Sequence, residues 1–320
     1  MTGWQVTSTA LTPPQVAGTL ALAEAATAAD GIGPLSEHVL LHLRYDGDHP
    51  GPGQDFVVTA GGDIVGYAYL DPPGADAESS GELVVHPARR RQGIGRSLLE
   101  ALITASAGHP LRLWAHGDLP AATRLAGQHG FERFRALWQM RRPLDAPLDE
   151  PVLPPGRVLR TFVPGQDEDE WLALNGRAFA KHPEQGAWTR HDLDLREREP
   201  WFDPAGFFVA THDGDMTGFH WTKVHPAGEQ DGGGDDGRVS EIPVGEVYVV
   251  GVDPAEQGSG LGRALTLVGL RHLRDLGLGQ VMLYVDEDNT PAIRMYQRLG
   301  FERTRTDAMY RRPPGSQPPR

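Results

Sequence analysis

A strand followed by a glycine-rich turn and a helix occurs twice in this 320-residue chain, and this repeat limits the possible folds most. The second copy, residues 246–270, reads EVYVVGVDPAEQGSGLGRALTLVGL. Its Val-rich start is typical of a buried strand, and a helical pattern follows the glycines. Such a turn can hold phosphate, because free backbone N–H groups and the positive end of a helix dipole meet there. The first copy, residues 82–102, reads ELVVHPARRRQGIGRSLLEAL.

The similarity between the two copies extends over whole halves of the chain. A shift of 167 residues aligns residues 85–88 with 252–255 and 93–96 with 260–263, and a shift of 170 aligns 130–133 with 300–303. A period this long indicates a duplicated domain rather than a solenoid. We therefore expect an N-terminal domain at 1–142, a proline-rich linker at 143–155, a C-terminal domain at 156–312 and a tail at 313–320.

Composition excludes several classes of protein. The chain has no cysteine, so it has no disulfide and no Cys-ligated metal site. Its net charge of −13 argues against a general binder of nucleic acid or anionic membranes, so an anionic ligand needs a local basic pocket. No signal peptide and no apolar run of roughly 18 residues are evident. We expect a cytoplasmic monomer that binds small molecules.

Both halves predict the same order of elements. In the first half, helices are expected at 12–30 and 39–43, hairpin strands at 56–60 and 64–70, a strand at 82–85, a helix at 95–105, a strand at 111–115, a helix at 121–128 and a strand pair from 131 to about 140. In the second half, we expect a helix at 167–180, hairpin strands at 207–211 and 216–224, an acidic glycine loop at 228–237, a strand at 280–285, a helix at 291–299 and a last strand pair.

Other glycine motifs do not fit. Arg263 stands where the dinucleotide fingerprint needs its third small residue, and Gln257 stands where G-x-S-x-G needs its first glycine. A P-loop sequence is absent. The histidines show neither H-E-x-x-H nor a close ligand pair, so no metal is expected.

The pattern that fits is [QR]-x-x-G-x-[GA], at Arg90-x-x-Gly93-x-Gly95 and at Gln257-x-x-Gly260-x-Gly262. With Asn289-x-x-Ala292-x-x-x-Tyr296 downstream, both halves resemble the GNAT N-acetyltransferases. The resemblance implies an α/β (α+β) fold of two tandem domains, each with a mixed, mostly antiparallel sheet flanked by helices, whose two central parallel strands part to admit acetyl-CoA. The implied acetyl-CoA contacts are Leu83, Val84, Val85, Arg91, Gln92, Gly93, Ile94, Gly95, Arg96, Val250, Gly251, Val252, Gln257, Gly258, Ser259, Gly260, Leu261, Gly262, Arg263, Asn289, Thr290, Pro291, Ala292, Ile293 and Arg294.

The halves differ at the groups that handle protons. By the shifts above, Glu246 aligns with Ser79, Asn289 with Leu119 and Tyr296 with Ala126. The resemblance implies that Glu246 is the general base, acting through water, and that Tyr296 protonates the leaving thiolate. A period of two places Glu246 on the same face as Tyr248, Val250 and Val252. We therefore expect acetyl-CoA binding in both halves and acetyl transfer in the second, although a solvated strand-end Glu246 and a packing Tyr296 are the simpler alternatives.

The acceptor follows from a closer resemblance. The segments at 180–186, 222–226 and 281–286 are similar to a tandem GNAT subfamily of actinobacteria that acetylates the cysteinyl amine of desacetylmycothiol. The resemblance implies acceptor contacts from Glu37, Glu184, Lys223, Glu246 and Tyr284. Surface charge is the simpler explanation for Glu184 and Lys223, as is a helix-start carboxylate for Glu37. Two alternatives remain: a tandem GNAT enzyme acting on another amine, and a non-catalytic acetyl-CoA sensor.

Overall fold

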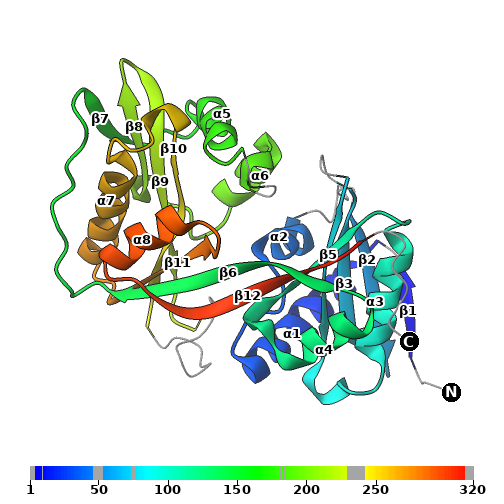
Figure 1. The fold of residues 1–320 in the computed structure, drawn as a ribbon. Coiled ribbons are helices and arrows are strands. Elements are labelled where there is room, and N and C mark those ends of the chain that lie inside the picture. Colours follow the sequence, from blue (N-terminus) through cyan, green and yellow to red (C-terminus); the bar gives the residue numbers. More distant parts are fainter. Residues whose placement is uncertain are drawn as a thin grey trace. The chain divides into compact units, whose positions relative to one another are not determined.

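The computed structural model describes residues 4–8, 10–45, 53–73, 77–180, 182, 185–228 and 242–313. These residues form two units (Figure 1). Unit 1 contains the described residues up to Trp138 and those from Arg305 onwards, and unit 2 contains those between Gln139 and Thr304. Within the described ranges, no helix is long and apolar enough to cross a membrane.

Unit 1 is a sheet covered by helices on both faces. Its strand order is β1 (Gln5–Ser8), β2 (Gln54–Ala60), β3 (Asp63–Asp71), β4 (Ser79–Val85), β5 (Leu111–Ala115) and β12 (Glu302–Arg312). Helices α1 (Pro13–Asp30) and α2 (Glu37–Tyr45) pack on one face, where Val84 is buried. Helices α3 (Ile94–Ala105) and α4 (Pro120–Gln128) pack on the other, against Leu83 and Val85. The alternation of β4 therefore fits a strand buried on both faces.

Unit 2 repeats this plan. Its strand order is β6 (Glu132–Pro143), β11 (Gln280–Asp286), β10 (Val244–Val252), β9 (Asp215–His225), β8 (Phe207–His212) and β7 (Arg157–Thr161). Helices α5 (Glu168–Ala178) and α6 (Arg190–Glu197) bury an aromatic cluster centred on Trp171 and Trp221. Helix α7 (Leu261–Asp275) covers the other face, and α8 (Thr290–Arg298) follows β11.

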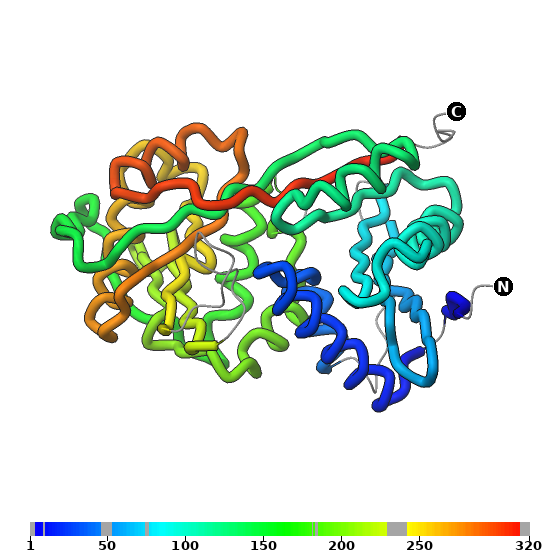
Figure 2. Tube along the Cα trace, turned by 90° about the horizontal axis from the view of Figure 1, so that it is seen from below, coloured from blue at the N-terminus to red at the C-terminus, as the bar shows by residue number. Residues whose placement is uncertain are grey.

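The last strands of the two halves are exchanged. β12, the end of the second half, pairs antiparallel with β5 of unit 1, and β6, the end of the first half, lies next to β11 of unit 2. Figure 2 shows the red C-terminal segment entering unit 1. The linker predicted at 143–155 would make each domain one continuous segment of the sequence. In the structure, the boundaries between the two units instead lie inside β6 and inside β12. Each sheet takes its last strand from the other half of the sequence.

The predicted strand pairs near 131–140 and after residue 301 were wrong, because each segment is one long strand. Neither segment contains the Gly, Pro or Asn that a tight turn requires. The other predicted helices and strands are present with ends shifted by a few residues. The sequence reading missed β1, β7 and α6, which are short elements at the edge of each unit. The predicted loop at 228–237 and the tail at 313–320 lie almost entirely outside the described residues.

A buried ion cluster fixes β12 in unit 1. His116, which follows β5, lies between two carboxylates: Asp307 on β12 approaches its Nδ1 at 3.5 Å, and Glu82 on β4 approaches its Nε2 at 3.7 Å. Burial opposes the charged form, but the two carboxylates raise the pKa of His116 to about 10. Burial would likewise raise the pKa of both carboxyl groups, but His116 and backbone N–H donors lower them instead. The cluster therefore holds the exchanged strand by buried charge.

We predict that His116→Ala lowers the free energy of unfolding by about 3–5 kcal/mol, because it leaves two buried carboxylates without their cation. Urea denaturation measures this, with the exposed His109→Ala as control. The stabilisation should be complete below the unfolded His pKa of about 6.5 and should be lost as the pH rises towards 10. At acid pH the stabilisation should fall as Glu82 and Asp307 become protonated. Equal unfolding free energies for His116→Ala and the wild type across this range would contradict the prediction.

Candidate active site

In both units, the two central parallel strands are paired over three residues and then part. In unit 1, Ser79–Gly81 on β4 pair with Leu111–Leu113 on β5. In unit 2, Gly245–Val247 on β10 pair with Val281–Leu283 on β11. Each strand continues beyond this ladder, so its further backbone groups face a gap. A ligand with its own donors and acceptors can satisfy these groups.

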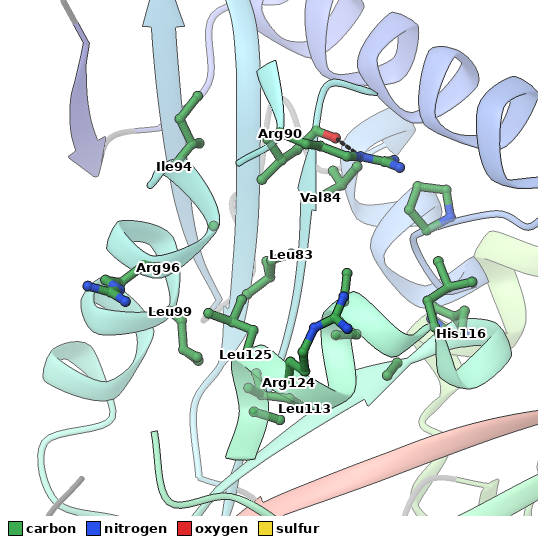
Figure 3. Close-up of a pocket in the computed structure, with 18 of the residues that line it drawn as sticks. Leu83, Val84, Arg90, Ile94, Arg96, Leu99, Leu113, His116, Arg124 and Leu125 are labelled. Carbon is green, nitrogen blue, oxygen red and sulfur yellow. Dashed lines mark hydrogen bonds between the residues drawn. The ribbon is translucent and has the colours of Figure 1, made fainter. Parts of the chain in front are cut away.

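In unit 1 the gap opens into a cavity of about 540 Å³. Figure 3 shows Leu83 and Val84 from β4 and Leu113 from β5 in its wall, with Leu99 of α3 and Leu125 of α4. Of the nine acetyl-CoA contacts predicted in the first half, eight line this cavity, and Gln92 does not. An apolar channel of this size suits a slender organic ligand.

The cavity also has cationic side chains in its lining. Five arginines are among its lining residues: Arg89, Arg90, Arg91, Arg96 and Arg124. Arg90 is held in place by a two-point ion pair with Asp30, at 2.7 and 2.6 Å. Gly93, the residue before α3, has a φ of 91°, a conformation that favours glycine. The acidic chain thus provides the local basic pocket that an anionic ligand needs, at a helix N-terminus.

The corresponding loop of unit 2 has the same backbone. Gly258 and Gly260 have φ values of 84° and 90°, and Gly260 precedes the first turn of α7 as Gly93 precedes that of α3. The predicted contacts 257–263 lie in this loop and first turn. Those at 289–294 form the start of α8, where the Asn289 side chain accepts a hydrogen bond from the Ala292 N–H at 3.3 Å. Asn289 therefore caps α8.

A β-bulge distinguishes β10 from β4. The pairing of β10 with β9 skips Tyr248, between Val247 and Val249, whereas β4 pairs with β3 without interruption. The extra residue changes the alignment of the halves. Glu246 lies opposite Lys223 as Ser80 lies opposite Asp71, so its counterpart is Ser80, not the predicted Ser79.

The bulge also changes which side chains share a face. Tyr248 packs against the aromatic cluster under α5 and α6, whereas Val250 and Val252 pack against Leu261 and Leu265 of α7. The predicted common face of Glu246 with Val250 and Val252 was therefore wrong, because a bulge breaks the period of two.

Glu246 is buried and has a histidine partner. Its side chain is 8% exposed, and its Oε2 lies 2.6 Å from Nε2 of His225, which is 10% exposed. The sequence reading did not assign a role to His225, although its place two residues after Lys223 puts it on the same face of β9. The alternative of a solvated strand-end glutamate does not fit this burial.

Lys223 lies among aromatic rings on the same face. Its Nζ is 4.5 Å from the ring centre of Trp201 and 5.4 Å from that of Tyr248. Both distances are within the range of cation–π attraction. The Tyr248 hydroxyl accepts a 2.7 Å hydrogen bond from Arg196 Nε. The sequence reading missed Trp201 and Arg196, because they come from loop and helix segments without a motif.

Tyr296 is buried on α8. Its side chain packs edge-on against Phe301, with ring centres 5.7 Å apart, and burial raises its pKa well above the ordinary value. The phenol therefore keeps its proton at neutral pH, as a proton donor must. Ala126, which aligns with it, is a buried core residue of unit 1 that carries no hydroxyl.

The remaining predicted acceptor contacts lie on other elements. Tyr284 is half-buried on β11, and its hydroxyl accepts a 3.0 Å hydrogen bond from Gln139 Nε2. Glu37 is the first residue of α2 in unit 1. Glu184 lies outside the described residues. The structure thus brings Glu246 and Lys223 directly opposite each other, whereas Tyr284 and Tyr296 are held on separate elements of the same unit.

Comparisons with known proteins match both units. The model of the acetyltransferase (GNAT) family matches residues 171–301, and that of an acetyltransferase (GNAT) domain matches 52–133. A tandem GNAT protein from the clavulanic acid biosynthesis pathway has the same fold, with a TM-score of 0.70 at 23% identity over 99% of both chains.

Curated relatives are much more similar in sequence. A mycothiol acetyltransferase of Thermobispora bispora is 58% identical over 94% of this chain and 97% of its own. One of Thermomonospora curvata is 57% identical over 97% of both chains. These matches confirm the predicted resemblance to that tandem GNAT subfamily, which is also called mycothiol synthase. The chain therefore belongs to the mycothiol acetyltransferase family, whose members here match in both GNAT halves.

Proposed function

We propose that this protein transfers the acetyl group of acetyl-CoA to the cysteinyl amine of desacetylmycothiol, giving mycothiol and CoA. The names of the relatives that match nearly the whole chain support this acceptor. The bulge at Tyr248 beside the buried Glu246 supports placing the chemistry in unit 2, because β4 of unit 1 has Ser80 at the position of Glu246 and pairs with β3 without a bulge.

Glu246 serves as the general base in this proposal. An α-amino group has a pKa of about 8, so most of the acceptor arrives as an ammonium ion that cannot attack. Glu246 takes the ammonium proton through a water molecule, and the neutral nitrogen attacks the thioester carbonyl carbon. Backbone N–H groups freed at the bulge donate to the carbonyl oxygen as it gains negative charge.

Tyr296 completes the reaction as the general acid. When the tetrahedral intermediate collapses, the carbon–sulfur bond breaks and CoA leaves as a thiolate. The buried phenol of Tyr296 gives its proton to that sulfur, and solvent restores the proton afterwards. The ammonium nitrogen thus loses two protons, one to Glu246 before attack and one to solvent as the intermediate collapses. Sulfur gains one proton from Tyr296, so the reaction releases one proton overall.

Acceptor recognition involves Glu37, Glu184, Lys223 and Tyr284 in this proposal. Sugar and inositol hydroxyls form strong hydrogen bonds with charged partners. Lys223, whose ammonium group is fixed by Trp201 and Tyr248 next to Glu246, is the best placed of these in unit 2. The cavity of unit 1 binds acetyl-CoA without transferring its acetyl group, since no base or acid aligns there.

We expect CoA release from acetyl-CoA to require desacetylmycothiol, as measured by coupling the released thiol to a chromogenic disulfide. Desacetylmycothiol itself carries a thiol, so the background without enzyme is subtracted and mycothiol is confirmed by mass spectrometry. An aminoglycoside and a peptide with a free N-terminus serve as comparison acceptors. Turnover with either of these and none with desacetylmycothiol would reject the proposed acceptor.

We expect Glu246→Gln and Tyr296→Phe each to lower kcat by about 10²- to 10⁴-fold, the usual contribution of one proton-transfer group. Both changes keep the shape of the side chain, so the KM for acetyl-CoA should change little. Steady-state kinetics on folded variants measures both constants. Wild-type kcat in Tyr296→Phe would show that another group protonates the thiolate.

The two copies of the glycine loop provide a matched comparison. A Cβ on Gly95 or Gly262 would lie 3.5 Å from its nearest neighbour, an ordinary contact, so both units should tolerate substitution. Gly262→Leu should block the phosphate site of unit 2 and abolish turnover, whereas Gly95→Leu should spare it. Kinetics and acetyl-CoA titration of both variants measure this. An inactive but folded Gly95→Leu enzyme would mean that unit 1 takes part in catalysis.

A further inference from the structure

His225 is the side chain closest to the carboxylate of Glu246. It is the last residue of β9, two positions beyond Lys223, and its Nε2 lies 2.6 Å from Glu246 Oε2. Both side chains are at least nine-tenths buried. A contact this short between a ring nitrogen and a carboxylate oxygen requires a proton between them, because two lone pairs would repel each other.

A buried carboxylate needs a donor if it is to stay ionised. Removing a carboxylate from water without a compensating hydrogen bond costs several kcal/mol, and the group then takes up a proton instead. The Nε2–H of His225 supplies a donor, and it also holds the carboxylate in one orientation.

Unit 1 lacks both members of this pair. Ser80 occupies the position of Glu246, opposite Asp71. Two residues further along, Pro73 stands where unit 2 has His225. The histidine and the carboxylate that it contacts are therefore both specific to unit 2 at these positions.

We propose that His225 is a positioning residue for the reaction: its Nε2–H holds the carboxylate of Glu246 in one orientation, directed to the water that carries the amine proton. This inference rests on the proposed role of Glu246 as general base. The proton passes from the amine to water and from water to the second carboxylate oxygen, while His225 keeps its own proton.

The neighbouring side chains on the adjacent elements have contacts of their own. On β9, Lys223 lies opposite Glu246, but its Nζ is directed to the rings of Trp201 and Tyr248. On β11 the opposite residue is Met282, which cannot donate. From α6, Arg196 reaches Tyr248.

Four variants of the full-length protein test the proposal: His225→Ala, His225→Gln, Glu246→Gln and the double variant His225→Ala/Glu246→Gln. Glutamine places an amide N–H close to the position of Nε2, and this amide neither gains nor loses a proton near neutral pH. The control is His220→Gln, a change at a buried histidine of the same strand that contacts the Leu265 carbonyl at 2.7 Å and not Glu246. Circular dichroism and thermal unfolding establish that each variant is folded.

We expect His225→Ala to lower kcat by about 10- to 100-fold, the effect of misplacing a reacting group by about 1 Å, with the KM for acetyl-CoA unchanged. His225→Gln should recover most of the kcat. His220→Gln should lower the unfolding temperature and leave the kcat close to the wild-type value.

The double variant separates positioning from general damage. If His225 acts through Glu246, His225→Ala should cause no further loss of kcat in the Glu246→Gln background. A further loss there equal to that in the wild type, or failure of glutamine to recover activity, would overturn the inference. Full activity of Glu246→Gln would instead reject the proposed base, so the two failures are distinguishable.

Discussion

The fold of each unit depends on a parallel ladder that ends after three residue pairs. Parallel strands that remained paired would use all their backbone groups on each other. Because β4 and β5 part after Gly81 and Leu113, and β10 and β11 after Val247 and Leu283, each unit keeps unpaired backbone at the centre of its sheet. A glycine turn and a helix N-terminus stand at the end of the same strand in both units. An elongated ligand with a thioester arm and phosphate groups can therefore bind with its arm in the gap and its phosphates at the glycine turn.

One inserted residue makes the two halves different. Without a bulge, β4 alternates regularly, and Val84 and Val85 point to opposite helix layers. With Tyr248 inserted, β10 directs Glu246 and Tyr248 towards the aromatic layer under α5 and α6, while Val250 returns to the α7 side. A bulge also frees backbone donors from the ladder. In the proposed reaction, the base, the oxyanion donors and Lys223 therefore all come from this part of unit 2.

The exchange of β6 and β12 makes neither half of the sequence a complete sheet. Unit 1 needs β12 beside β5, and the buried Asp307 on that strand is balanced by His116 within the unit. Each unit contains a strand from the other half of the sequence. Unfolding of one half therefore removes a strand from the other unit. The first half of the sequence consequently supplies a strand to the sheet of unit 2, whatever ligand the cavity of unit 1 holds.

The sequence by itself determined the duplication, the strand–glycine–helix units and the residues of the phosphate loops, because these depend on local backbone conformation and short spacing. It also identified Glu246 and Tyr296 as the groups that the first half lacks. Only the tertiary structure decided the exchange of the last strands, the bulge at Tyr248 and the pairing of His225 with Glu246. These depend on which strand lies beside which, and in what register. A single extra residue can reverse the face of a strand without leaving any mark in the pattern of apolar residues.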